Sequence, residues 1–251
     1  MSRLNYPTFP TRHGYMSEKI QLDYIHSAIA KKLLPQDAYR VAQIMSLEAS
    51  NDMTKPIQFW QLFSVLGPEP MISIVSDFYR RVFRDEQWFA SAFARIGGVE
   101  HHIRTQSSMW IDVMGGGPAY HGGDFRLNFH HTHNAFQVMT DKGAHLWTKL
   151  MLESLEASKG EMTDDPRVRP AINTFLSFFM GKYAEEFAFE NKSVFGDTNP
   201  PVKRKINFMK MTSEAIEALT ETELREALQE QGVDISKYPE KQDLVNKAQM
   251  L

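Results

Sequence analysis

The chain has 251 residues, 42% of them hydrophobic and 12% aromatic, with no cysteine and a formal net charge of −3. This length suits one large domain with appendages, and the charge predicts no nucleic-acid partner. The absence of cysteine excludes disulfides, iron–sulfur clusters and thiolate ligation of haem.

Targeting signals are weak in this sequence. No apolar run approaches the ~20 residues that cross a bilayer, so we expect a protein that does not span a membrane. The first fourteen residues lack the apolar core of a secretory signal. We therefore expect an intracellular location, in the cytoplasm or in an organelle such as the mitochondrion.

Residues 1–56 are predicted to form an N-terminal helical extension. Prolines and a glycine in residues 1–16 favour an extended arm. Apolar residues at spacings of three and four predict a helix over 17–34, which Pro35 ends, and a second helix follows over 36–49. The apolar faces of this pair must pack on the main domain or on a protein partner.

The main domain is predicted to be helical over residues 57–192. Helical spacing of apolar residues predicts helices over 71–85, 101–114, 141–157 and 166–189, while Trp88, Phe89 and Phe93 form an aromatic corner. The second of these helices carries Ile103, Ser107, Trp110 and Met114 on one face. No stretch alternates like a strand, so the fold class is all-α.

A histidine cluster lies between two of these predicted helices. His121, His130, His131 and His133 fall within thirteen residues, and His145 follows. Such a cluster indicates a metal or a metal-containing cofactor. His130 and His133 are three residues apart and could bind zinc, but the sequence has no His-Glu-x-x-His motif and no Cys pair to complete that site.

The order of motifs over about residues 58–190 resembles the truncated (2/2) haemoglobins, and among them the second group. The resemblance rests on Leu66-Gly67, Phe78-Tyr79, Arg81-Val82, Phe93, Gly116-Gly117-Pro118, Tyr120, His133-Asn134-Ala135-Phe136, Trp147 and Leu150-Met151. It implies a 2-over-2 globin-like domain with haem b (iron protoporphyrin IX) as cofactor.

The resemblance also implies a set of site residues. His133 is the proximal iron ligand, followed by Phe136; Tyr79 and Trp147 donate hydrogen bonds to an iron-bound ligand; Phe93 stacks on the porphyrin; Ile103 and Ser107 lie on the distal side. The run before the histidine departs from the family pattern, so His130 is the second choice of ligand and His131 the third. A register shift would bring His101 or His102 to the distal side. The plain alternative is that Tyr79 and Trp147 are core residues and the histidines surface or capping residues.

The C-terminal part is predicted to be separate. A linker over 193–211 precedes a two-helix module over 212–251, with helices predicted over 212–231 and 243–251. Its Glu-Lys-x-Asp-Leu-Val ending resembles SAP modules. Residues 211–251 carry nine acidic and four basic side chains. Because phosphate binding depends on positive charge, we expect this module to bind protein rather than DNA.

Two functions follow from these observations. The first is a haem protein that binds dioxygen or another diatomic gas, with nitric oxide or peroxide chemistry as an extension. The second is a globin-fold subunit without haem that has a structural role in a larger assembly. The appendages at both ends favour the second, and the ordered motifs favour the first. The sequence alone does not decide whether the chain is an enzyme.

Overall fold

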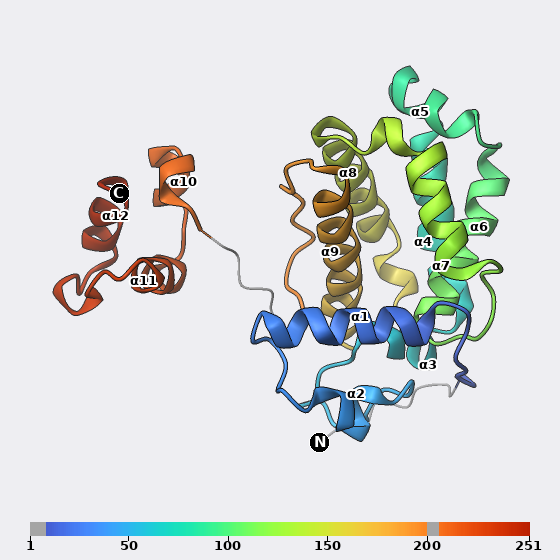
Figure 1. The fold of residues 1–251 in the computed structure, drawn as a ribbon, viewed down its shortest axis with the longest axis horizontal. Coiled ribbons are helices and arrows are strands. Elements are labelled where there is room, and N and C mark those ends of the chain that lie inside the picture. The colour runs from blue at the N-terminus through green and yellow to red at the C-terminus, as the bar shows by residue number, and fades with distance from the viewer. Residues whose placement is uncertain (1–8, 200–205) are drawn as a thin grey trace. The chain divides into compact units, whose positions relative to one another are not determined.

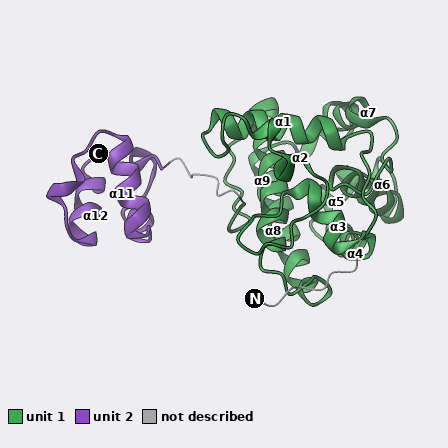
Figure 2. Cartoon of the chain, turned by 90° about the horizontal axis from the view of Figure 1, so that it is seen from below, with its two compact units in different colours: residues 1–202 green, residues 203–251 purple. Residues whose placement is uncertain are grey.

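The computed structural model describes residues 9–199 and 206–251, which fold into two compact units divided between residues 202 and 203 (Figure 2). Each unit has a hydrophobic core of its own. Regular structure in the described residues is helical, apart from an isolated bridge between Arg12 and Gly116. The predicted all-α fold class is confirmed. Within these residues, no helix combines the length and apolar character needed to cross a bilayer.

Unit 1 is built around α4, which packs on both α6 and α8 (Figure 1). Its helices are α1 (Ser17–Ala30), α2 (Ala42–Met45), α3 (Leu62–Leu66), α4 (Pro68–Val82), α5 (Gln87–Ala94), α6 (Val99–Val113), α7 (Gly123–Phe129), α8 (Asp141–Ala157) and α9 (Val168–Phe187). Short turns join them: η1 (Ala38–Arg40), η2 (Phe59–Gln61), η3 (His130–Asn134), η4 (Phe136–Val138) and η5 (Lys159–Glu161). The four predicted helices of the main domain correspond to α4, α6, α8 and α9.

The starts of two of these helices follow from local chemistry. At α8 the side chain of Thr140 accepts a hydrogen bond from the Gly143 N–H, as expected of an N-cap threonine. At α4 the chain turns at Gly67, whose φ of 64° suits glycine, and Pro68 takes the first helical position, where no N–H is needed.

One buried carboxylate attaches the N-terminal arm to α6. Asp112 is fully buried and accepts hydrogen bonds from three consecutive N–H groups, those of Tyr15, Met16 and Ser17, at 2.8–3.2 Å. It also accepts one from the Tyr120 N–H at 3.2 Å. A helix leaves its first N–H groups without internal partners, so Asp112 caps α1 from a different helix. The helix then lies across unit 1 in contact with α6 (Figure 1).

The predicted helix over 36–49 was wrong. The structure has the single turn η1 and the four-residue α2 there, with Val41 between them in an extended conformation. Backbone carbonyl groups that would accept hydrogen bonds within a longer helix instead accept them from side chains outside this segment. Gln61 donates to the carbonyls of Gln43 and Ser46, and Trp60 donates to that of Ile44.

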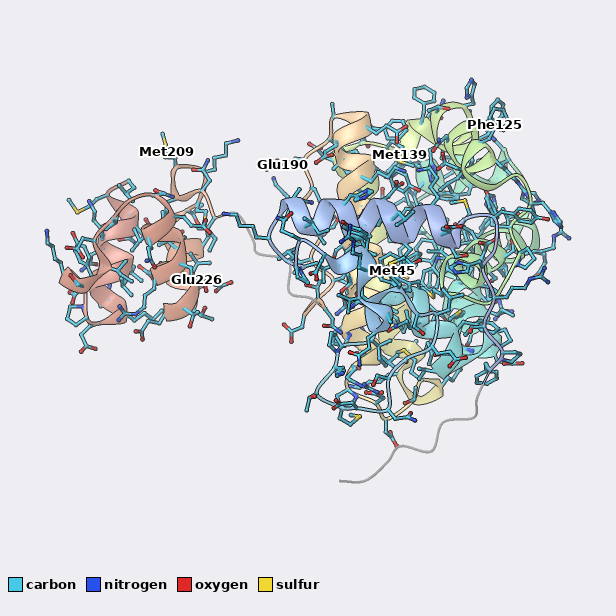
Figure 3. All side chains as sticks on the ribbon, turned by 60° about the horizontal axis from the view of Figure 1, so that its bottom comes forward. Met45, Phe125, Met139, Glu190, Met209 and Glu226 are labelled. Atoms are coloured by element: carbon cyan, nitrogen blue, oxygen red, sulfur yellow. The ribbon has the colours of Figure 1, made fainter. Side chains whose placement is uncertain are left out.

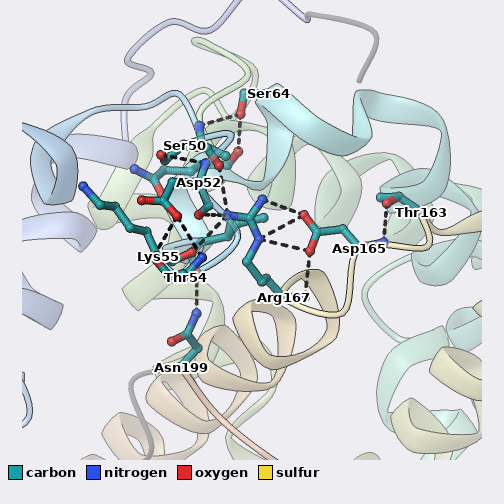
Figure 4. A network of polar contacts seen from close by, with 12 residues as sticks. Ser50, Asp52, Thr54, Lys55, Ser64, Thr163, Asp165, Arg167 and Asn199 are labelled. Atoms are coloured by element: carbon teal, nitrogen blue, oxygen red, sulfur yellow. Dashed lines mark hydrogen bonds and ion pairs between the residues drawn. The ribbon is translucent and has the colours of Figure 1, made fainter. Parts of the chain in front are cut away.

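A buried ion pair fixes the loop that follows. The guanidinium of Arg167, before α9, pairs with the fully buried carboxylate of Asp165 at 2.8 Å. Its Nη1 also donates to the backbone carbonyls of Ser50, Asp52 and Lys55 at 2.9–3.0 Å (Figure 4). A charge buried in this way is tolerated because Nε, Nη1 and Nη2 each donate to at least one acceptor.

Unit 2 contains α10 (Ser213–Glu217), α11 (Glu221–Glu230) and α12 (Lys241–Gln249), with single turns η6 (Phe208–Lys210) and η7 (Ile235–Lys237). The prediction of one helix across 212–231 was wrong, because Thr220 and Glu223 form a capping box that begins α11. The resemblance of this unit to SAP modules stays a prediction, as do the domain boundaries at residues 56, 192 and 211.

Candidate functional site

Two adjoining cavities lie between α6 and the segment that runs from α7 to η3. The first, here called the polar cavity, has a volume of about 180 Å³, and the second, the aromatic cavity, about 100 Å³. Six residues line both: Tyr79, Gln106, Met109, Leu127, His130 and His131. A movement of these side chains would join the two cavities into one.

The two cavities differ in chemistry. The polar cavity is also lined by Ile96, His101, His102, Thr105, Tyr120, Arg126, Phe129 and Asn134. The aromatic cavity is also lined by Phe89, Phe93, Trp110, Ala135, Val138, Met139, Gly143, Ala144, Trp147, Phe175, Leu176, Phe179, Met180, Tyr183 and Phe189. No Asp or Glu is found among the described lining residues of either cavity. Together they suit a ligand with a flat apolar body and a polar or anionic edge.

The α6 side of the cavities presents three polar side chains. The Tyr79 hydroxyl, from α4, donates a long hydrogen bond of 3.4 Å to Oε1 of Gln106. The Tyr79 ring stacks on His102 at 5.1 Å between centroids. Nε2 of His102 lies 2.9 Å from the Phe93 carbonyl and must carry the proton, since a carbonyl only accepts. Burial raises the pKa of Tyr79 and lowers that of His102.

The opposite side is formed by α7 and the π-helical turn η3. His131 lies in this turn, and its Nδ1 is 2.8 Å from the carbonyl oxygen of Leu127, four residues earlier. Nδ1 must therefore carry the proton, which leaves Nε2 with a free lone pair. Burial lowers the pKa of His131 to about 3. A neutral imidazole with a fixed tautomer is the form that binds a metal ion.

His130 is the second imidazole on this side. It lines both cavities, and its ring meets that of His131 edge to face at 5.1 Å. Burial lowers the pKa of His130 to about 4, so this ring is also neutral at physiological pH. Unlike His131, it has no hydrogen bond among the described residues that would fix its tautomer.

Three of the predicted site residues line the cavities. Tyr79 lines both, and Phe93 and Trp147 line the aromatic cavity. Ile103 and Ser107 are buried, but they lie on the core side of α6 and line neither cavity. The residues one position before them, His102 and Gln106, face the polar cavity instead. This offset of one residue along α6 is the register shift that the sequence raised for His102.

His133 and Phe136 lie at the surface. His133 is exposed, lines neither cavity, and stacks on Phe129 at 4.3 Å between ring centroids. Phe136 is 55% exposed. Phe125 belongs to the same exposed aromatic surface and projects from α7 into solvent (Figure 3). The positions of His133 and Phe136 give no support to their predicted roles, which stay predictions.

Some cavity residues were ranked low or missed from the sequence. His131 was the third choice, and Gln106, Leu127 and Tyr183 were not singled out. A usable signal was present for one of them: Leu127 precedes His131 by four residues, the spacing at which a helical side chain reaches a free carbonyl. Tyr183 lies on α9, far from His131 in the sequence, and no local pattern indicates that the two side chains meet.

The zinc alternative has no support in the described residues. Within 9–199 and 206–251, no group of three or more His, Cys, Asp or Glu side chains is arranged to hold a metal ion. The histidines of η3 would therefore need ligands from a cofactor rather than from the chain.

Comparisons with known proteins give a consistent result. Residues 61–180, just under half of the chain, match the family described as bacterial-like globin. The chain is 31% identical over 109 residues to group 2 truncated hemoglobin 3-1 of Lotus japonicus, which covers 43% of this chain and 63% of that protein. It is 33% identical over 98 residues to two-on-two hemoglobin-3 of Arabidopsis thaliana, covering 39% and 55%. The chain thus spans less than two thirds of these relatives. No solved structure matches it significantly.

Proposed function

Residues 61–180 are a domain of the truncated globin family, and on this premise we propose that the chain binds haem and that His131 is the iron ligand. The observation that carries the proposal is the hydrogen bond from Nδ1 of His131 to the Leu127 carbonyl. It fixes the ring and leaves Nε2 free beside the cavities. An imidazole held through its other nitrogen by a backbone carbonyl is a strong metal ligand.

The described residues fit a haem in three respects. The aromatic cavity offers Phe93, Trp147 and other apolar side chains to a flat ring. The polar cavity offers Arg126 and Tyr120, with no carboxylate among its described lining residues, to an anionic edge. The two halves are small, so the six shared side chains must separate to admit a porphyrin. Because the chain has no cysteine for a thioether bond, we propose haem b.

Haem iron with one imidazole ligand supplies an open coordination position where dioxygen or another diatomic gas binds. The α6 side supplies the polar groups for such a ligand. Burial keeps the proton on the Tyr79 hydroxyl, so this group remains a donor at physiological pH. In this structure the Tyr79 proton is donated to Gln106, and it would turn from that amide oxygen toward a bound ligand. The indole N–H of Trp147 is a second donor, without a partner among the described residues. Most other residues of the aromatic cavity are apolar, and a less polar environment strengthens such hydrogen bonds.

The test compares three single variants of the full chain after reconstitution with haem. We expect a strong Soret band for the unchanged chain and its loss or a large blue shift for His131→Ala. His130→Ala should retain the band with weaker haem affinity, and His133→Ala should match the unchanged chain.

Each contrary outcome has a defined meaning. A normal spectrum for His131→Ala together with a lost band for His133→Ala would return the ligand to the sequence-based choice. The absence of haem uptake by the unchanged chain would overturn the proposal altogether and leave the structural-subunit function.

A further inference from the structure

Tyr183 lies against the ring of His131 from the side of α9. The two ring centroids are 4.2 Å apart with an interplanar angle of 35°, the shortest centroid separation among the ring pairs of the described residues. Tyr183 also lines the aromatic cavity, and burial raises its pKa well above the usual value. Its hydroxyl has no hydrogen-bond partner among the described residues, so its contact with His131 is made by the ring alone.

The other contacts of His131 leave one motion free. The hydrogen bond from Nδ1 to the Leu127 carbonyl fixes one point of the imidazole and its tautomer. Because the ring is also bonded at Cγ, this hydrogen bond limits rotation about the Cβ–Cγ bond and leaves only small tilts of the ring plane. His130 meets His131 edge to face at 5.1 Å, but it belongs to the same turn and moves with it. The flat ring of Tyr183, which comes from α9, restrains this tilt of the His131 ring.

We infer that Tyr183 is a positioning residue that sets the plane of the His131 imidazole. The inference rests on the proposed function, because it concerns the ligand histidine of that proposal. Tyr183 is anchored by its neighbours on α9, since its ring packs against Phe179 at 5.9 Å and Phe187 at 6.5 Å. The orientation of α9 is thereby transmitted to the ligand ring, and groups behind a metal ligand of this kind tune the metal.

A purely structural role for Tyr183 predicts something different. Its loss would then lower stability and leave the ligand plane unchanged. The test therefore needs a readout of ring orientation. The ¹H shifts of the four haem methyl groups in the ferric cyanide complex provide one, because their order depends on the direction of the axial imidazole plane.

The experiment uses the full chain loaded with haem and cyanide. We expect Tyr183→Leu to change the spread and order of the methyl shifts and Tyr183→Phe, which keeps the ring, to retain them. Phe178→Leu is the matched control on the same helix, because Phe178 makes no ring contact with Tyr183 among the described residues and lines neither cavity, and it should retain the pattern. Tyr183→Met, which fills the space without a ring, replaces the Leu variant if that one does not fold.

Haem loss gives a second measure. Aromatic pairs are worth ~0.5–1.5 kcal/mol, so transfer of haem to an acceptor globin should be about two- to twelvefold faster for Tyr183→Leu than for Tyr183→Phe. An unchanged methyl pattern in both the Leu and Met variants would overturn the inference while haem binding through His131 stands. Retention of the native pattern in His131→Ala, or failure of the chain to take up haem, would overturn the proposed function and the inference with it.

Discussion

The two sides of the cavities hold their polar groups in different ways. On the α6 side, a regular helix of 15 residues carries His102 and Gln106, and its far end is anchored by Asp112 to the start of α1. On the other side, the seven-residue α7 runs into the π-helical turn η3, which places His130 and His131 toward the cavities and His133 toward solvent.

The two sides therefore differ in what holds their polar side chains in position. The α6 side depends on a long helix held at its end by buried hydrogen bonds. The η3 side depends on contacts of individual rings, above all the Leu127 carbonyl and Tyr183 with His131. Loss of the Asp112 anchor should therefore appear as lost stability, whereas loss of a single ring contact on the η3 side should change the surroundings of His131. Four predictions test this contrast.

The largest expected effect is on the α6 side, at Asp112. Asp112→Ala leaves four backbone N–H groups without their acceptor inside the protein, and we expect it to lower the free energy of unfolding by ~3–5 kcal/mol. Asp112→Asn keeps an acceptor oxygen and should cost less. Urea unfolding of both variants measures this, and equal losses for Ala and Asn would show that the hydrogen bonds are not the cause.

The second prediction concerns pH and the η3 side in the haem-free chain. The folded-state pKa of His131 is lowered from 6.5 to about 3, so the unfolded chain binds more protons in acid. Stability is then complete above pH ~6.5 and falls as the pH drops from there toward 3, by ~2 kcal/mol for His131 between pH 7 and pH 5.

Urea midpoints at these two pH values test that expectation. His131→Leu should remove the share of the dependence that His131 contributes, because the leucine takes up no proton, while the share of His130 remains. His133→Leu, at an exposed site, should leave it unchanged. A slope that survives His131→Leu and disappears with His133→Leu would contradict the burial argument.

The third prediction returns to the α6 side and concerns ligand chemistry. Gln106→Leu removes the acceptor that takes the Tyr79 proton in this structure. A neutral hydrogen bond is worth ~1 kcal/mol, so freeing this proton for a bound ligand should make dioxygen dissociate about fivefold more slowly. Stopped-flow displacement of dioxygen by carbon monoxide measures the rate. Thr105→Val, a neighbouring change in the polar cavity that leaves the Tyr79–Gln106 pair intact, is the control and should alter the rate much less.

The smallest expected effect is at Ser107. Its hydroxyl is buried and has no hydrogen-bond partner among the described residues. Ser107→Ala removes this unpaired group and should leave stability unchanged or raise it by up to ~1 kcal/mol, with no effect on gas binding. Thermal unfolding and the same stopped-flow assay check both parts. A clear change in the dioxygen rate would return Ser107 to the role that the sequence predicted.

The sequence predicted the long helices well because their apolar periodicity is strong. α4, α6, α8 and α9 all lie where such spacing predicts them. The failures came where distant groups decide the backbone. Residues 36–49 form no single helix because Trp60 and Gln61 take the local carbonyls, and residues 212–231 are split by the Thr220 capping box.

The residues predicted for the site meet the cavities only in part. Tyr79, Phe93 and Trp147 line them, while their predicted roles stay predictions. Ile103 and Ser107 are one position from the residues that face the cavity, a shift of about 100° around a helix. Near His133 the π-helical turn changes which of three neighbouring histidines points inward. Local sequence patterns do not encode such a turn.

The buried Arg167 has a practical consequence for anyone who wishes to isolate the globin segment. Its guanidinium is satisfied partly by the carbonyls of Ser50, Asp52 and Lys55, which precede residue 57. A protein limited to residues 61–180, the part that matches the family, would lack these three carbonyl acceptors while Arg167 remained buried. The matched segment alone should therefore express poorly, and expression should recover when residues 46–60 and the remainder of α9 (Val168–Phe187) are included.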